Sequence, residues 1–241
     1  MSTRRGAVVL FGILAVALMA TACQSNKTEA SKIVVIFVDV SKSVKDYQVY
    51  RDAWAKITSR LRGGDRIVLG AINDQTYTAF RAVLDREIPT LNYLTDNKLT
   101  YEGETRKVDQ EISTALERVL SQSRSPKTDV MNALALAEKI FGGDRRRPVI
   151  VLLSDMLEDS EEHNFERDRL TEGFAHRIIE EKRSKGQLPD LGGATAYVAG
   201  ASAQSAVKAK EVERFWLDFV TAANGRLLPQ NYGPALLSFN E

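Results

Sequence analysis

Three oxygen-bearing side chains follow one strongly apolar segment of this 241-residue chain. The segment 33–38 reads IVVIFV, and Asp39, Ser41 and Ser43 come directly after it on alternate residues. One carboxylate and two hydroxyls with this spacing in a turn converge on one point. Their oxygens are hard ligands, which suit Mg²⁺, Mn²⁺ or Ca²⁺. The spacing therefore predicts part of a site for a divalent cation.

Two further oxygen ligands are predicted from later parts of the chain. Asp155 follows a second apolar segment, 148–154, and Thr128 stands in a loop at the start of a predicted helix. In an open parallel sheet, ligands bind outside the carboxyl ends of the strands, where the strand order reverses. We therefore expect Asp39 and Asp155 to end adjacent parallel strands and to share one crevice. The competing interpretation makes Ser43 and Thr128 helix N-caps and each aspartate an ordinary strand end.

The segments that must position these residues alternate between strand and helix patterns. Continuous β-branched or apolar runs predict buried strands, an alternating run predicts an antiparallel edge strand, and apolar residues three and four apart predict helices. We predict strands at 33–38, 66–72, 77–84, 148–154, 194–199 and within 226–239, and helices at 44–61, 104–121, 128–141, 161–185 and 205–223. This order predicts a single α/β domain, a doubly wound, mostly parallel sheet with helices on both faces and one antiparallel edge strand.

The amino terminus has the pattern of a targeting segment. Arg4 and Arg5 precede an apolar or small-residue run, 6–22, which ends at Cys23. The residues 20–23, Ala-Thr-Ala-Cys, resemble the lipobox of bacterial lipoproteins. The resemblance implies that 1–22 is a lipoprotein signal peptide and that Cys23 is lipidated. The alternatives are an ordinary secretory signal with an incidental cysteine and an uncleaved membrane helix.

The same resemblance predicts the location of the chain. Residues 23–31 form the lipidated amino terminus and a polar tether, and 32–241 form the folded domain. A lipid on Cys23 implies attachment to a membrane of the bacterial cell envelope. Gln24 rather than aspartate after the cysteine implies the outer membrane, facing the periplasm, in a Gram-negative cell.

Composition excludes several functional classes. The 33 Lys and Arg against 32 Asp and Glu leave a formal charge of +1, without the basic excess that a nucleic-acid partner requires. A single cysteine forms neither an intramolecular disulfide nor a zinc cluster. The two histidines, His163 and His176, lie in a charged predicted helix away from the strand ends, and neither a phosphate loop nor a dinucleotide motif is present. We therefore predict a binding protein rather than an enzyme.

The five candidate ligands together resemble a known arrangement. DxSxS after the first strand, a threonine in a later loop and an aspartate ending a central strand are similar to the metal-ion-dependent adhesion site of von Willebrand factor A domains. The resemblance covers residues 32–230 and fills all five positions, with Asp39, Ser41, Ser43, Thr128 and Asp155. It implies that both serines bind the cation directly, that the threonine does so in one state, and that the aspartates act mostly through water.

The resemblance implies a function and has one departure. The family usually has glycine after the last aspartate, whereas this chain has Met156, which affects the local backbone turn. The implied function is a membrane-anchored lipoprotein that binds Mg²⁺ and presents it to an acidic residue of a protein partner. The alternatives are a metal-dependent phosphoester hydrolase and a structural domain with an empty site.

Overall fold

The computed structural model describes residues 30–44, 46–73, 77, 80–92, 94–122 and 124–241. Ser31–Glu241 is one compact unit. The predicted signal peptide, 1–22, and Cys23 lie outside the described residues, as does most of the predicted tether. In the part of the chain that is described, no helix is both long and apolar enough to cross a membrane.

Six strands form one mostly parallel sheet, as predicted. They are β1 (Lys32–Asp39), β2 (Arg66–Ile72), β3 (Leu84–Glu87), β4 (Arg147–Leu153), β5 (Thr195–Ala199) and β6 (Arg226–Gly233). Their order across the sheet is β3-β2-β1-β4-β5-β6. All neighbouring pairs are parallel except β2 and β3, so that β3 is an antiparallel edge strand. The order reverses between β1 and β4, which places a switch point between these two strands.

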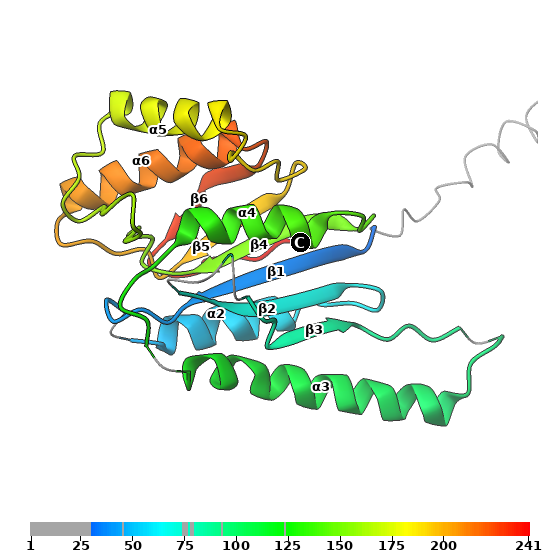
Figure 1. Cartoon of the computed structure of the whole chain (residues 1–241). Helices are drawn as coiled ribbons and strands as arrows, with labels where there is room; N and C mark the ends of the chain where they lie inside the picture. Colours follow the sequence, from blue (N-terminus) through cyan, green and yellow to red (C-terminus); the bar gives the residue numbers. More distant parts are fainter. Residues whose placement is uncertain (1–29, 45, 74–76, 78–79, 93, 123) are drawn as a thin grey trace, which may run out of the picture. The chain divides into compact units, whose positions relative to one another are not determined.

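Helices cover both faces of the sheet (Figure 1). They are α2 (Gln48–Thr58), α3 (Lys98–Leu120), α4 (Val130–Phe141), α5 (Glu172–Ser184) and α6 (Ala206–Ala222). Helices α2 and α3 lie on one face, and α4, α5 and α6 lie on the other. Alternate residues of β1 enter the two cores, with Val34, Ile36 and Val38 on the α2 side and Ile33, Val35 and Phe37 on the α4 side. Burial on both faces explains why this strand reads as a continuous apolar run.

The edge strand lies later in the chain than predicted. The alternating segment 77–84 indicated a strand, but β3 spans Leu84–Glu87 and carries three exposed polar side chains. The apolar side chain that produced the alternation has another role, because the ring of Phe80 packs edge-on against Phe37 at 5.9 Å between centroids. A Cβ atom on Gly70 would stand 2.1 Å from that ring, so glycine at this position makes room for it. Packing against the sheet therefore accounts for the apolar residue at position 80.

Three predicted helices have the wrong limits. Helix α2 spans Gln48–Thr58 instead of 44–61. Helix α3 begins at Lys98 instead of 104, because the side chain of Asn97 accepts a hydrogen bond from the Leu99 N–H at 2.9 Å and caps an earlier turn. The predicted helix at 161–185 begins only at Glu172. The segment before it is a loop that turns inward, where Phe165 is fully buried and lies 4.6 Å from Phe215 between ring centroids. Charged residues in this loop mimicked a solvated helix.

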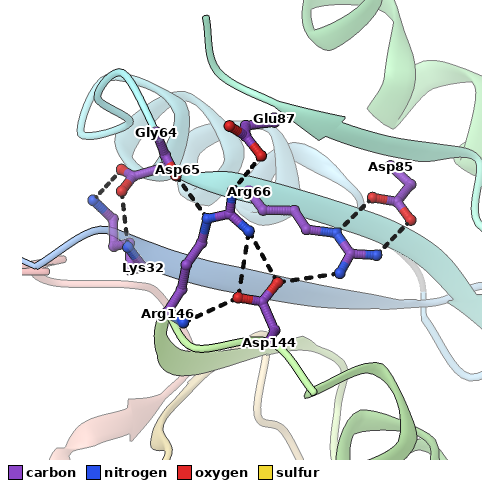
Figure 2. Close-up of polar contacts among 8 residues, drawn as sticks. All are labelled: Lys32, Gly64, Asp65, Arg66, Asp85, Glu87, Asp144 and Arg146. Atoms are coloured by element: carbon purple, nitrogen blue, oxygen red, sulfur yellow. Dashed lines mark hydrogen bonds and ion pairs between the residues drawn. The ribbon is translucent and has the colours of Figure 1, made fainter. Parts of the chain in front are cut away.

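Ion pairs join the amino-terminal ends of β1, β2 and β4 (Figure 2). The Lys32 ammonium lies 2.6 Å from the Asp65 carboxylate, and both side chains are buried. Asp144 accepts hydrogen bonds from the guanidinium groups of Arg66 and Arg146. The network continues through Asp85, Glu87 and the backbone carbonyl of Gly64. Every carboxylate drawn at this end of the sheet thus has a cationic partner.

Candidate metal centre

The candidate site residues lie at the opposite end of the sheet, where the parallel strands have their carboxyl-terminal ends. Asp39 is the last residue of β1, and Asp155 lies two residues beyond the end of β4. These strands are adjacent and parallel, with Val38 opposite Leu153, so the two carboxylates follow neighbouring strand ends as expected. A short backbone pairing between Ser41 and Ser125 brings the loop before α4 against the turn that follows β1. The topology therefore collects three separate chain segments at the switch point.

Asp39 is the buried centre of the site. Its carboxylate accepts hydrogen bonds from the backbone N–H of Ser41 and from the hydroxyl of Ser154, each at 2.8 Å. The hydroxyls of Ser41 and Thr128 also hydrogen-bond to it. Burial raises the pKa of Asp39, and these four hydrogen bonds oppose the shift without cancelling it. The carboxylate is held in position by neutral groups.

Asp155 and Ser43 complete the cluster. The Asp155 carboxylate accepts the Leu157 N–H at 3.0 Å and interacts with the Ser43 hydroxyl. Burial and then the charge of Asp39 raise the pKa of Asp155 to about 6, while the Ser43 hydrogen bond opposes this. The hydroxyl oxygens of Ser41 and Ser43 are 2.7 Å apart. The five predicted residues are therefore linked in the order Thr128, Asp39, Ser41, Ser43, Asp155.

The two hydroxyls proposed as possible helix caps do not cap helices. The N-cap residue of α2 is Tyr47, which makes no side-chain cap bond, so Ser43 lies before the helix rather than at its start. The N-cap of α4 is Asp129, whose side chain accepts the Asn132 N–H at 3.1 Å. Thr128 stands one residue earlier and hydrogen-bonds to Asp39. The capping interpretation is wrong for both residues.

The residues of the site differ in exposure. Asp39, Ser41, Thr128 and Asp155 are each at most 4% exposed, whereas Ser43 is exposed. Ser43 is therefore the member of the site that solvent reaches.

The donor set matches a hard divalent cation. Among the described residues, none of the lysine and arginine ion pairs involves Asp39 or Asp155. Two buried carboxylates that lack a counter-charge are costly unless they are protonated or neutralised from outside. No described group of three or more His, Cys, Asp or Glu side chains is arranged to hold a metal, and here three of the five candidate residues carry hydroxyls. Such an all-oxygen set suits Mg²⁺, Mn²⁺ or Ca²⁺.

Met156 has a left-handed backbone conformation, which favours glycine. Its φ angle is 66°, in the left-handed region that side chains other than glycine rarely occupy. The surroundings hold it there, because its N–H donates to the Ser154 hydroxyl and its carbonyl accepts the Trp216 indole N–H, both at 2.9 Å. The side chain is fully buried. The departure from glycine thus leaves the turn after Asp155 intact.

Sequence reasoning missed two polar residues of this edge. Ser154, interpreted as the end of a strand, links Asp39 to the Met156 turn through its hydroxyl. Glu158, which lies in the loop after Asp155, is 1% exposed and accepts the first N–H groups of α4, from Val130 and Met131. Burial and the charge of Asp129 raise the pKa of Glu158 to about 8. Both positions directly flank Asp155 and its loop, which is the signal that would have indicated them.

His163 also differs from its predicted setting. It lies in the loop before α5 rather than on an exposed helix, and its ring packs edge-on against Phe174 with 5.9 Å between centroids. Burial lowers the pKa of His163, which favours the neutral imidazole.

Comparison with known proteins gives distant structural neighbours. No family model matches the sequence, and no curated protein matches it. A pilus adhesin, SpaC from Lactobacillus rhamnosus GG, aligns with a TM-score of 0.48 and 10% identity over 84% of this chain and 28% of the adhesin. Proximal thread matrix protein 1 from the mussel byssus aligns with a TM-score of 0.38 and 11% identity over 81% of this chain and 46% of its own. The type V pilus tip protein Mfa5 from Porphyromonas gingivalis aligns with a TM-score of 0.31 and 13% identity over 73% of this chain and 29% of its own. The chain thus spans less than half the length of each neighbour.

Proposed function

We propose that this chain is a von Willebrand factor A-type domain that holds Mg²⁺ at Asp39, Ser41, Ser43, Thr128 and Asp155 and binds a protein partner there. The observation that carries the proposal is the surrounding of two buried carboxylates by hydroxyls and backbone N–H groups, without a described lysine or arginine partner, at the switch point of the sheet. With both carboxylates ionised, the cluster has the charge that one divalent cation neutralises. Mn²⁺ and Ca²⁺ share the same ligand preference.

The open side of the site defines the kind of partner. Ser43 is exposed while the carboxylates lie beneath it, so a partner group approaches from the solvent past this residue. Mg²⁺, when bound, supplies an exchangeable coordination position that a carboxylate can occupy. A partner that offers an aspartate or glutamate matches this position in charge and in ligand type.

We further propose that the chain is anchored in the bacterial envelope through a lipid on Cys23. The described chain enters the domain at Ser31, whose carbonyl accepts the Arg147 N–H at the amino-terminal edge of the sheet. The metal centre lies at the other edge, and β1, eight residues long, separates the two by about 25 Å. A tether that joins at Ser31 therefore leaves the open side of the site free for a partner.

The direct test measures cation binding and partner capture with one set of variants. The full chain, purified in detergent, is titrated with Mg²⁺ by isothermal calorimetry and is then used to capture proteins from an envelope extract in Mg²⁺ or in EDTA. We expect saturable Mg²⁺ binding and a captured protein that EDTA releases, and we expect Asp39→Asn to lose both. Asp46→Asn removes the same charge from an exposed residue nearby and should keep both.

Two outcomes would contradict the proposal. If the wild-type chain shows no saturable Mg²⁺ heat, the site does not hold the cation. If capture of the partner is equal in Mg²⁺, in EDTA and with Asp39→Asn, the partner binds elsewhere on the molecule.

A further inference from the structure

Two buried tyrosine hydroxyls at the start of α2 have no hydrogen-bond partner among the described residues. Among the described side chains, the buried polar atoms without a partner are the hydroxyls of Tyr47, Tyr50 and Thr105. Tyr50 is only 1% exposed. Leaving a buried hydroxyl unpaired costs about 1–3 kcal/mol, and such groups in proteins usually pair with an ordered water or ion. Tyr50 therefore calls for a partner that is not part of the polypeptide.

The ring of Tyr50 lies beside Gly200 and near the backbone of Ser154. A Cβ atom built on Gly200 would stand 2.7 Å from the Tyr50 ring and 3.1 Å from the Ser154 carbonyl oxygen. The ring is therefore next to the backbone of the residue whose hydroxyl donates to Asp39. Gly200 has a φ of +102° and lacks the side chain that would displace the ring. Tyr47 stacks obliquely on Tyr50, with 5.6 Å between ring centroids, and the Arg124 guanidinium lies over its outer face.

The carboxylates of the site act on both hydroxyls. After burial, the charges of Asp39 and Asp155 raise the pKa of Tyr50, and burial and Asp39 raise that of Tyr47. Both phenols are therefore neutral and offer one donor and two lone pairs. A water placed between Tyr50 and the carboxylates would satisfy the hydroxyl and the remaining oxygen lone pairs together.

We propose that the Tyr50 hydroxyl, with Tyr47 beside it, positions the water molecules that complete the shell of the cation, and that it thereby makes the site select Mg²⁺ over Ca²⁺. This inference rests on the proposed function. Mg²⁺ keeps several waters when it binds to proteins, whereas Ca²⁺ takes six to eight oxygens, many of them directly from the protein. Groups that hold water in place next to a hard cation therefore favour the smaller ion. Tyr50 is a positioning residue, because it acts through water rather than as a ligand.

The test compares Mg²⁺ and Ca²⁺ affinities of the full chain in detergent for wild type and Tyr50→Phe, by isothermal calorimetry. Removing a group of the outer shell usually weakens metal affinity by about 10–100-fold. We expect Tyr50→Phe to weaken Mg²⁺ binding by about tenfold and to change Ca²⁺ binding much less. Thr105→Val removes the third unpaired hydroxyl, on α3, and should change neither affinity.

Thermal unfolding of the metal-free chain separates this role from a structural one. Phenylalanine keeps the ring and removes an unpaired hydroxyl, so the metal-free variant should unfold at the same temperature as wild type or above it. Equal Mg²⁺ affinity of wild type and Tyr50→Phe would overturn the inference and leave the proposed function standing. Equal losses of Mg²⁺ and Ca²⁺ affinity would overturn the selectivity. A wild-type chain that binds neither ion would overturn both the inference and the proposed function.

Discussion

The aspartates at the two ends of the parallel strands have opposite surroundings. The amino-terminal and carboxyl-terminal edges of the sheet mean these two ends of its strands. At the amino-terminal edge, Asp65 pairs with Lys32 at 2.6 Å, and Asp144 accepts hydrogen bonds from two arginines (Figure 2). At the carboxyl-terminal edge, Asp39 and Asp155 are surrounded by hydroxyls and backbone N–H groups. Asp65 is as buried as Asp39 and Asp155, so for these three residues the difference lies in the charge of the groups that surround the carboxylates.

The pKa values follow this difference. Burial opposes ionisation of Asp144, but the Arg146 N–H and the guanidinium groups of Arg66 and Arg146 outweigh it and lower its pKa. At the other edge burial dominates, and the pKa of Asp155 rises to about 6. One edge is neutralised within the chain, whereas the other is neutralised by protons or by an added cation. Strongly perturbed carboxylates of the second kind are typical of functional sites.

The largest expected effect on stability comes from removing one member of an ion pair at the amino-terminal end of the strands. Asp65→Ala leaves the Lys32 ammonium buried without its partner and removes the acceptor for the N–H groups of Lys32 and Arg62. Removal of one member of a buried pair costs about 3–5 kcal/mol. We expect this loss in the free energy of unfolding, measured by urea denaturation without metal, and we expect Asp39→Asn to lose far less. Similar losses in both variants would mean that the two edges do not differ in charge balance.

The second effect comes from adding a divalent cation, which would supply positive charge to the aspartates at the carboxyl-terminal end of the strands. A cation that binds only the folded chain raises its free energy of unfolding by about 2.7 kcal/mol at a concentration 100 times the Kd. We expect Mg²⁺ to stabilise wild type in this way in urea denaturation and to leave Asp39→Asn unchanged. Asp144→Asn, at the amino-terminal end of the strands, should have a lower free energy of unfolding than wild type. Mg²⁺ should nevertheless raise that free energy by the same amount in both. Loss of the gain in Asp144→Asn would contradict a site confined to the carboxyl-terminal edge.

The third effect is a difference in pH dependence. Glu158, at the carboxyl-terminal edge, has its pKa raised from 4.5 to about 8, so the folded chain binds its proton more tightly than the unfolded chain. Its stabilising contribution is complete below pH 4.5 and is lost as the pH rises towards 8, by at most about 1.4 kcal/mol per pH unit. Glu158→Gln keeps an acceptor for the α4 N–H groups and should remove this slope, as measured by urea denaturation between pH 5.5 and 7.5. Asp144 has the opposite sign, because its lowered pKa makes its contribution decline as the pH falls. Parallel pH profiles for wild type and Glu158→Gln would show that Glu158 is ionised in the folded chain.

Much of the fold follows from local patterns in the sequence. The runs at 33–38, 66–72 and 148–154 became central strands because burial on both faces requires uninterrupted apolar residues. Asp39 and Asp155 were found from the same runs, since a carboxylate that ends such a strand must lie at the carboxyl edge of a parallel sheet. The helix patterns identified the helices but not their limits, because caps and packing decide where a helix begins.

By itself, then, the sequence determined the α/β class and indicated the five residues of the candidate site, because apolar period and residue chemistry are local properties. The tertiary structure alone decided which charges meet. Lys32 and Asp65 are 33 residues apart, and Arg66 and Asp144 are 78 apart, so no local pattern indicates that these aspartates are neutralised. The tertiary structure also buried Tyr50 and left its hydroxyl unpaired, because the space beside Gly200 and Ser154 exists only once α2 packs on the ends of β4 and β5. Burial and long-range pairing distinguish an aspartate that stabilises the fold from one that is available to a ligand.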